Sequence, residues 1–168
     1  MTNYLQLIDT NTHGPRYDVT PLFSDHEAFT ALIADLSRPF DASDFDVVAG
    51  IDALGFILGT AVALRFRKGF IPIRKGGKLP VEVDTCAFVD YTGQEKSLEL
   101  RADAIKQGTR VLIVDEWIET GAQVKAAIQL IESQGGVIAG IAAINIDDNE
   151  ATRPLLETRR CISAVTSY

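Results

Sequence analysis

Short apolar runs alternate along the chain with segments in which apolar residues recur at helical spacing. The apolar runs predict strands at 46–51, 70–73, 111–114 and 137–146. Two helices are predicted between these runs, at 55–68 and after residue 123. Strands that alternate with helices indicate βαβ units. The pattern therefore predicts an α/β fold with a mainly parallel, twisted sheet flanked by helices.

Capping and turn residues mark the ends of several elements. Ser24 to Glu27 form a capping-box pattern in front of an amphipathic helix at 29–36, and Pro39 follows as a stop signal. Gly69 is placed to end the helix at 55–68. Residues 81–100 predict two further strands around a loop at Thr92-Gly93-Gln94.

Composition limits the class of protein. The chain has 168 residues, 46% apolar and 23% charged, which suits one globular domain over residues 1–168. Its two cysteines, Cys86 and Cys161, have no metal-like spacing and suggest a reducing compartment. We find no signal-peptide pattern and no apolar run long enough for a bilayer, so we expect a cytoplasmic protein without membrane contact.

The net charge of −7 argues against a nucleic-acid partner, because an acidic surface repels phosphate backbones. The exception is local: the stretch Arg65–Lys78 holds six cations and no acid. One hypothesis is therefore a nucleic-acid-binding domain built on this stretch. Apart from Phe66 and Phe70, no aromatic residues are interleaved there for stacking on bases.

In a parallel sheet, ligands bind beyond the carboxyl ends of the strands, here just after Ile51, Ile73 and Val114. After Val114 come two acids, Asp115 and Glu116, and then Thr120-Gly121 before a helix. The helix start favours an anion, and carboxylates accept hydrogen bonds from a vicinal diol. These residues suit a phosphorylated ribose. They equally allow a plain strand, turn and acidic helix cap.

This segment resembles the phosphoribosyl diphosphate (PRPP) signature of type I phosphoribosyltransferases, which has an apolar strand, two acids and then Thr-Gly. Residues 70–80 resemble the matching stretch of adenine phosphoribosyltransferases, residues 49–56 their first pyrophosphate loop, and residues 17–22 their N-terminal hood. The resemblance extends over residues 14–146. It implies the type I phosphoribosyltransferase fold with a small hood at about 1–23.

The resemblance also implies a reaction, the conversion of adenine and PRPP to AMP and pyrophosphate in a homodimer, with Mg²⁺ carried by PRPP. It implies that Tyr17 and Val19 bind the base and that Asp90 and Tyr91 act on a flexible catalytic loop. No metal ligand is identified. The residues that it places around PRPP are Asp52, Ala53, Leu54, Arg74, Lys75, Lys78, Asp115, Glu116, Glu119, Thr120, Gly121, Ala122 and Gln123.

Several positions depart from the family pattern. Leu54 stands where the first pyrophosphate loop normally has Arg, and Tyr17 stands where the hood often has Arg, beside Arg16. Ala122 and Gln123 replace the usual Gly and Thr. The catalytic position, usually Glu, holds an Asp. These departures predict weaker PRPP binding than in a typical member.

Glu119 adds a carboxylate beside the expected phosphate site. It weakens binding if it points inward and has little effect if it points outward. Trp117 could pack against a neighbouring loop or shield the ribose, but we expect it to pack in the core. Two main hypotheses remain: a purine phosphoribosyltransferase, for adenine or another base, and a non-catalytic PRPP- or nucleotide-binding regulatory protein on the same fold.

Overall fold

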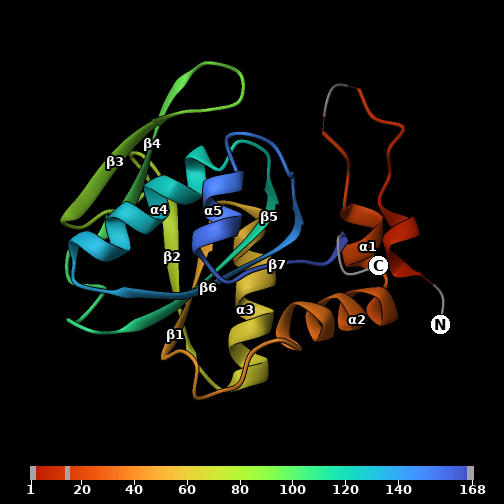
Figure 1. Cartoon of the computed structure of the whole chain (residues 1–168), viewed down its shortest axis with the longest axis horizontal. Helices are drawn as coiled ribbons and strands as arrows, with labels where there is room; N and C mark the ends of the chain where they lie inside the picture. Colours follow the sequence, from red (N-terminus) through yellow and green to blue (C-terminus); the bar gives the residue numbers. More distant parts are fainter. Residues whose placement is uncertain (1–2, 14–15, 166–168) are drawn as a thin grey trace.

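The computed structural model describes residues 3–13 and 16–165, which form a seven-stranded sheet between helices (Figure 1). The strand order is β3-β4-β2-β1-β5-β6-β7. The strands are β1 (Val47–Ile51), β2 (Gly69–Lys75), β3 (Val83–Val89), β4 (Glu95–Arg101), β5 (Arg110–Ile118), β6 (Val137–Ile146) and β7 (Cys161–Ser163). All neighbours from β2 to β7 pair in parallel, and only β4 pairs antiparallel, with β2 and β3. The predicted mainly parallel α/β sheet is confirmed.

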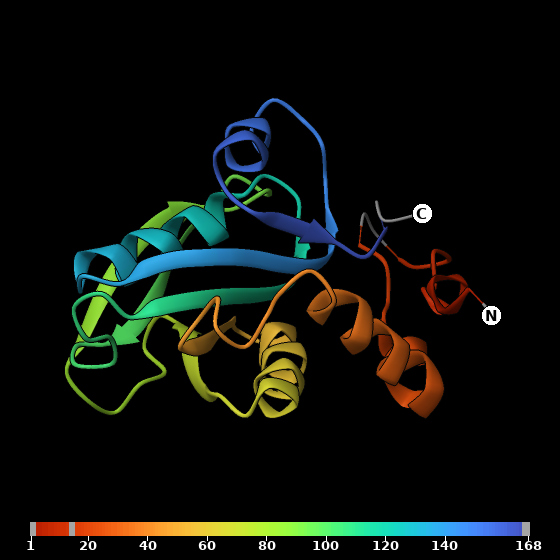
Figure 2. The same ribbon diagram turned by 60° about the horizontal axis from the view of Figure 1, so that its bottom comes forward.

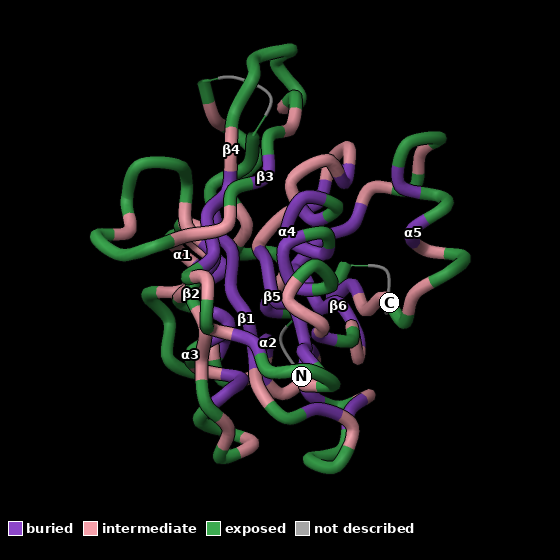
Figure 3. Tube along the Cα trace, turned by 90° about the vertical axis from the view of Figure 1, so that its left-hand side faces the viewer, coloured by how far each residue is buried: buried purple, intermediate pink, exposed green. Residues whose placement is uncertain are grey.

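The helices cover both faces of the sheet, as the view in Figure 2 shows. They are η1 (Tyr4–Leu7, a 3₁₀ turn), α1 (Thr20–Ser24), α2 (His26–Ser37), α3 (Leu54–Phe66), α4 (Ala122–Ser133) and α5 (Arg153–Thr158). On β5, Val111 and Ile113 pack in the core that contains α4, whereas Leu112 and Val114 pack in the core that contains α2 and α3. The central strands are therefore buried on both faces, which explains their continuous apolar runs (Figure 3).

The structure corrects two predicted helix boundaries. Asp25 caps α2, since its carboxylate accepts a 2.8 Å hydrogen bond from the Ala28 N–H. Ser24 instead ends α1, where its hydroxyl donates to a carbonyl of the preceding turn. Helix α3 ends at Arg67, whose left-handed backbone (φ 56°) lets the next N–H groups reach the last carbonyls. Gly69 starts β2 and does not end the helix.

Two strands extend further than their apolar runs. Strand β2 includes Arg74 and Lys75, beyond the predicted strand at 70–73, because both pair with β4. Strand β5 continues through the acidic residues to Ile118, because β6 pairs with it as far as Ile146. The loop at 92–94 and the stop at Pro39 are confirmed. Helix α5 and strand β7 were not predicted; both are short.

The N-terminal residues 3–13 and 16–23 form a separate excursion at one end of the molecule, the hood segment (Figure 1). Two backbone hydrogen bonds between Asp9 and Asp18, of 2.8 and 3.0 Å, close its base. The single domain over 1–168 and the hood boundary near residue 23 stay predictions. Within the described part of the chain, no helix has both the length and the apolar character needed to cross a membrane.

Glycines allow the turn from β1 into α3 to lie directly against β5. A Cβ on Gly50 would come within 2.4 Å of the Gly55 carbonyl oxygen and 2.8 Å of the Phe70 ring. A Cβ on Gly55 would lie 2.7 Å from the Val114 carbonyl oxygen. This close packing places residues 52–54 beside the end of β5.

We expect Gly50→Ala to destabilise the fold by about 1–3 kcal/mol, because backbone and a half-buried ring would have to move. Thermal unfolding measures the loss as a fall in Tm of several degrees. Gly69→Ala is the matched control, since its Cβ would meet only a Val47 methyl at 3.7 Å. Equal Tm values for the two variants would contradict this account of the turn.

Candidate active site

A cavity of about 790 Å³ opens where the parallel strands end. The chain segments that follow β1 and β5 reach it on either side of the point where strand order reverses, as expected for ligand sites in such sheets. The hood segment and the β3–β4 hairpin complete its wall. Predicted site residues that line it are Tyr17, Asp52, Ala53, Leu54, Lys75, Asp90, Tyr91, Asp115, Glu116, Glu119, Thr120, Gly121, Ala122 and Gln123.

Three residues of the predicted site do not line this cavity. Val19 is buried in the core, with 2% of its surface exposed. The Arg74 guanidinium lies 3.7 Å from an Asp52 carboxylate oxygen and donates to the Lys78 carbonyl. The Lys78 backbone N–H donates to Glu99. Contact of these three residues with substrate stays a prediction.

The cavity also contains residues that sequence reasoning missed. They are Gly76, Phe88, Lys96, Ser97, Ile118, Val124 and Asp147, together with Arg16 and Trp117, which were considered but not assigned to the site. Lys96 and Ser97 lie on β4, where the irregular pattern of residues 81–100 obscured which side chains share a face. Asp147 directly follows strand β6. Its position after a parallel strand is the sequence signal that would have identified it as a site residue.

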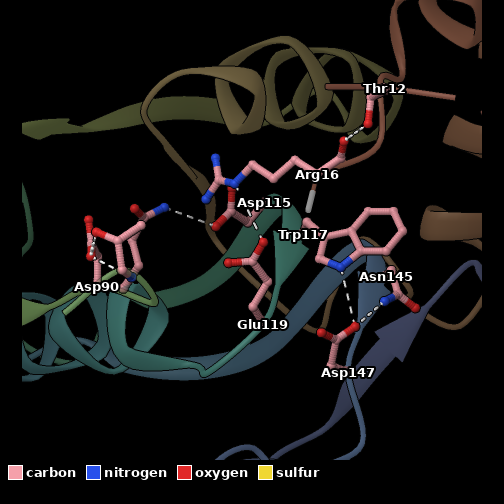
Figure 4. A network of polar contacts seen from close by, with 10 residues as sticks. Thr12, Arg16, Asp90, Asp115, Trp117, Glu119, Asn145 and Asp147 are labelled. Atoms are coloured by element: carbon pink, nitrogen blue, oxygen red, sulfur yellow. Dashed lines mark hydrogen bonds and ion pairs between the residues drawn. The ribbon is translucent and has the colours of Figure 1, made fainter. Parts of the chain in front are cut away.

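The expectation that Trp117 packs in the core is wrong. Its ring lies edge-on to Tyr17, with centroids 5.5 Å apart, at the wall of the cavity. The indole N–H donates a 3.2 Å hydrogen bond to Asp147, whose same oxygen accepts from Asn145 at 2.6 Å (Figure 4). Trp117 lies on the extension of β5 beyond the apolar run, where the core ends.

Asp115 is a buried carboxylate at the cavity floor, with 6% of its surface exposed. One oxygen accepts from the Glu116 N–H at 2.8 Å and the other from the Gln123 side-chain amide at 3.3 Å. Burial raises the pKa of Asp115 to about 7, and the neighbouring Glu116 charge adds to this. Burial also raises the pKa of Glu116, partly offset by the Arg16 charge. Gln123, which departs from the family pattern, thus donates a hydrogen bond to the buried Asp115 carboxylate.

The start of α4 lines the same cavity as these acids. Gly121, in the left-handed conformation (φ 70°), is the N-cap residue and has no side chain to cap the helix. Near it, the Thr120 hydroxyl accepts only a long 3.4 Å hydrogen bond, from the Ala122 N–H. The Glu119 carbonyl accepts from Asn149 at 2.7 Å, which holds the loop. Uncapped N–H groups and the helix dipole favour a phosphate at this position.

The hood segment approaches this loop through Arg16 and Tyr17. The Arg16 Nε lies 3.4 Å from a carboxylate oxygen of Glu119, and its guanidinium lies 4.5 Å from the centre of the Tyr91 ring. Figure 4 shows the Arg16 side chain reaching over Asp115 toward Glu119. Of the two orientations left open for Glu119, the structure has the carboxylate at the cavity, paired with Arg16.

Asp90 holds the tip of the β3–β4 hairpin in shape. One carboxylate oxygen accepts from the Thr92 hydroxyl at 2.6 Å, from the Thr92 N–H at 2.8 Å and from the Gln94 N–H at 3.1 Å. These bonds, the Thr92 hydroxyl first, lower the pKa of Asp90. In this arrangement Asp90 is an ionised acceptor at the mouth of the cavity.

Acids outnumber cations along the cavity. The charged lining residues are Asp52, Asp90, Asp115, Glu116, Glu119 and Asp147 against Arg16, Lys75 and Lys96. No group of three His, Cys, Asp or Glu side chains in the described part of the chain is arranged to hold a metal ion. The side-chain charge along the cavity is therefore net negative, which opposes an anionic ligand at the α4 start.

We expect the buried Asp115 to make stability depend on pH. Its pKa is raised above the unfolded value of 3.8, so its favourable contribution is complete below that value and is lost as pH rises through about 7. Relative to wild type, Asp115→Asn should become more stable from pH 5 to pH 7, by up to about 1.4 kcal/mol per pH unit, and then level off.

Chemical denaturation of both proteins at several pH values measures this difference. Asp103→Asn is the control, because Arg101 lowers the pKa of Asp103 and its contribution is constant above pH 5. A difference between wild type and Asp115→Asn that does not change over this range would refute the assignment.

Comparisons with known proteins agree with this geometry. The family model for the phosphoribosyl transferase domain matches residues 23–164. The adenine phosphoribosyltransferase of Chlorobium phaeovibrioides is 40% identical over 154 residues, covering 90% of this chain and 86% of the relative. That of Halothermothrix orenii is 45% identical over 125 residues, covering 74% and 72%.

Solved structures show the same fold. The adenine phosphoribosyltransferase of Thermoanaerobacter pseudethanolicus has a TM-score of 0.85 at 34% identity, covering 94% of each chain. That of Rhodothermus marinus has a TM-score of 0.83 at 33% identity, covering 94% of this chain and 92% of the other. The enzyme of Giardia lamblia, solved with 9-deazaadenine, has a TM-score of 0.84 at 28% identity, covering 95% and 93%. The chain belongs to the phosphoribosyltransferase family and is similar to its adenine phosphoribosyltransferases.

Proposed function

We propose that the protein is an adenine phosphoribosyltransferase of purine salvage, which converts adenine and PRPP to AMP and pyrophosphate. The observation that carries this proposal is the segment 115–123, where two carboxylates and an uncapped helix start face one cavity. Relatives named for this activity match most of the chain, and the Giardia structure contains an adenine analogue.

The arrangement suggests how PRPP binds. The ribose hydroxyls donate to Asp115 and Glu116, and the 5′-phosphate accepts from backbone N–H groups at the start of α4. The pyrophosphate then lies toward residues 52–54 and Lys75 across the cavity. Each side chain thereby meets the part of PRPP that its charge or hydrogen-bonding groups complement.

In the proposed reaction, the bond from ribose C1 to the pyrophosphate oxygen breaks and adenine N9 bonds to C1. Negative charge grows on the departing pyrophosphate, where Lys75 stabilises it. The base loses a proton, for which Asp90 is the proposed acceptor. Asp90 accepts three hydrogen bonds within its own turn through one carboxylate oxygen, and we propose that the hairpin tip rearranges when substrate binds.

The residues present fit Mg²⁺ that arrives with PRPP. Mg²⁺ is commonly held by one or two carboxylates together with phosphates and water, and the cavity has carboxylates on both sides. Its chemistry is to neutralise the charge of the pyrophosphate. Asp52, Asp115 and Glu116 are the side chains placed to meet it.

The base is proposed to lie against the Tyr17–Trp117 pair, where two rings of the hood and of β5 meet at the cavity wall. Val19 belongs to the hood segment and packs in the core, and it is proposed to anchor the hood there, in addition to its predicted contact with the base. We further propose that the protein acts in the cytoplasm as a homodimer and takes no nucleic acid or membrane partner.

A second candidate is a PRPP- or nucleotide-binding regulatory protein without turnover. Two observations favour it. The carboxylate of Asp90 is engaged in its own turn, and Leu54 brings no charge to the pyrophosphate side of the cavity.

The first experiment measures pyrophosphate release with PRPP, Mg²⁺ and adenine, guanine, hypoxanthine, uracil or orotate supplied singly. We expect turnover with adenine and much slower release with the other bases, because a base with the wrong edge leaves buried polar groups unpaired. Turnover with a different base would change the substrate. PRPP binding without turnover for any base would establish the second candidate.

Lys75 lines the cavity, whereas Lys78 lies outside its lining, so variants of the two residues compare a cavity cation with a neighbouring one. We expect Lys75→Gln to lower kcat/KM for PRPP by at least about tenfold, because it removes a charge that faces the pyrophosphate. Lys78→Gln should have a clearly smaller effect, since Lys78 lies outside the cavity lining. Steady-state kinetics of both variants, with circular dichroism as a check of folding, tests this, and the reverse order of effects would contradict the placement of PRPP.

A further inference from the structure

Glu119 presents an electrostatic problem at the proposed phosphate site. Its carboxylate lines the cavity two residues before Gly121, the N-cap of the helix that would hold the 5′-phosphate. Like charges in a partly buried cavity repel each other more strongly than at an open surface, because water screens them less there. An unpaired Glu119 would therefore weaken the binding of any phosphorylated ribose.

Arg16 is placed to cancel that charge. Its guanidinium pairs with Glu119 at 3.4 Å, and the Glu119 side chain is only 23% exposed. The Arg16 charge also acts on the two acids of the cavity floor, since it partly offsets the rise in pKa that burial causes at Asp115 and Glu116. One cation of the hood thus opposes all three carboxylates of the segment 115–119.

The position of Arg16 is held from two sides. The Thr12 hydroxyl donates to the Arg16 carbonyl, which ties its backbone within the hood segment. The guanidinium also lies 4.5 Å from the centre of the Tyr91 ring on the β3–β4 hairpin, a cation–π contact. Arg16 therefore connects the hood, the phosphate loop and the hairpin around one cavity (Figure 4).

We propose that Arg16 is a positioning residue for PRPP, which acts by neutralising Glu119 and holding its carboxylate away from the 5′-phosphate. The inference rests on the proposed function. It explains how the chain can tolerate Glu119, whose carboxylate departs from the family pattern. Arg16 offsets the repulsion that Glu119 introduces, and the two residues are expected to act as a unit.

A double-mutant cycle tests the pair. In the otherwise wild-type chain, Arg16→Gln should raise the KM for PRPP by about fivefold, the upper range for a partly exposed ion pair. In a Glu119→Gln background, the same change should raise the KM by less than about twofold, because no carboxylate remains to be neutralised. Arg16→Lys keeps the charge and should recover most of the wild-type KM.

The KM for adenine separates this role from a general loss of structure. We expect it to change little in the Arg16→Gln variant, whereas a disordered hood would raise the KM values of both substrates. Arg159→Gln is the matched control. Arg159 pairs with Glu132 at 2.9 Å on the surface, outside the cavity lining, and its loss should leave the KM for PRPP unchanged.

Binding without chemistry provides an independent readout. Trp117, the only tryptophan of the chain, lies at the cavity wall, so its fluorescence can report titration with ribose 5-phosphate or PRPP. The same coupling between Arg16 and Glu119 should appear in these Kd values.

If wild type binds and Arg16→Gln weakens binding equally in both backgrounds, the inference alone is overturned. If wild type binds neither compound, the proposed function fails and this inference with it. If both compounds bind but no base is turned over, the coupling in Kd still decides the inference.

Discussion

The arrangement of the candidate site depends on the extension of strand β5 beyond the apolar core. The strand is buried on both faces over residues 111–114, and β6 holds it straight for four residues more. This rigid extension delivers Asp115 into a site with little solvent and brings the chain to Gly121 in position to start α4. A carboxylate and an anion-binding helix start are thereby fixed relative to each other by backbone pairing, not by flexible side chains.

This arrangement produces a cavity that is rich in carboxylates. Burial raises the pKa of Asp115 to about 7, so without a ligand it is half protonated near neutral pH. In the proposed complex, the ribose diol would donate hydrogen bonds to these carboxylates, and a cation that arrives with the pyrophosphate would offset their charge. Such binding would reduce the repulsion among the carboxylates, which is a physical reason to expect a ligand that brings its own cations.

The hood and the β3–β4 hairpin give the cavity its walls but make few buried contacts with each other. The hood contacts the end of β5 and the loop after it through Tyr17 with Trp117 and Arg16 with Glu119, and it contacts the hairpin through Arg16 with Tyr91. Contacts of this kind are individually weak and can be exchanged when a ligand enters. In the proposed function, the sheet would position the sugar phosphate, and the exchangeable walls would admit and enclose the base.

The sequence by itself determined the fold class, the central strands and the main loop of the site. These are local or periodic properties: a doubly buried parallel strand reads as a β-branched run, and two acids before Thr-Gly follow it directly. Only the tertiary structure decided where the extended strands end, because β4 and β6 supply the pairing for residues 74–75 and 115–118. It also decided that Trp117 faces the cavity and that Arg16 meets Glu119. Those contacts join segments about a hundred residues apart, and no local pattern records which distant side chains the sheet brings together.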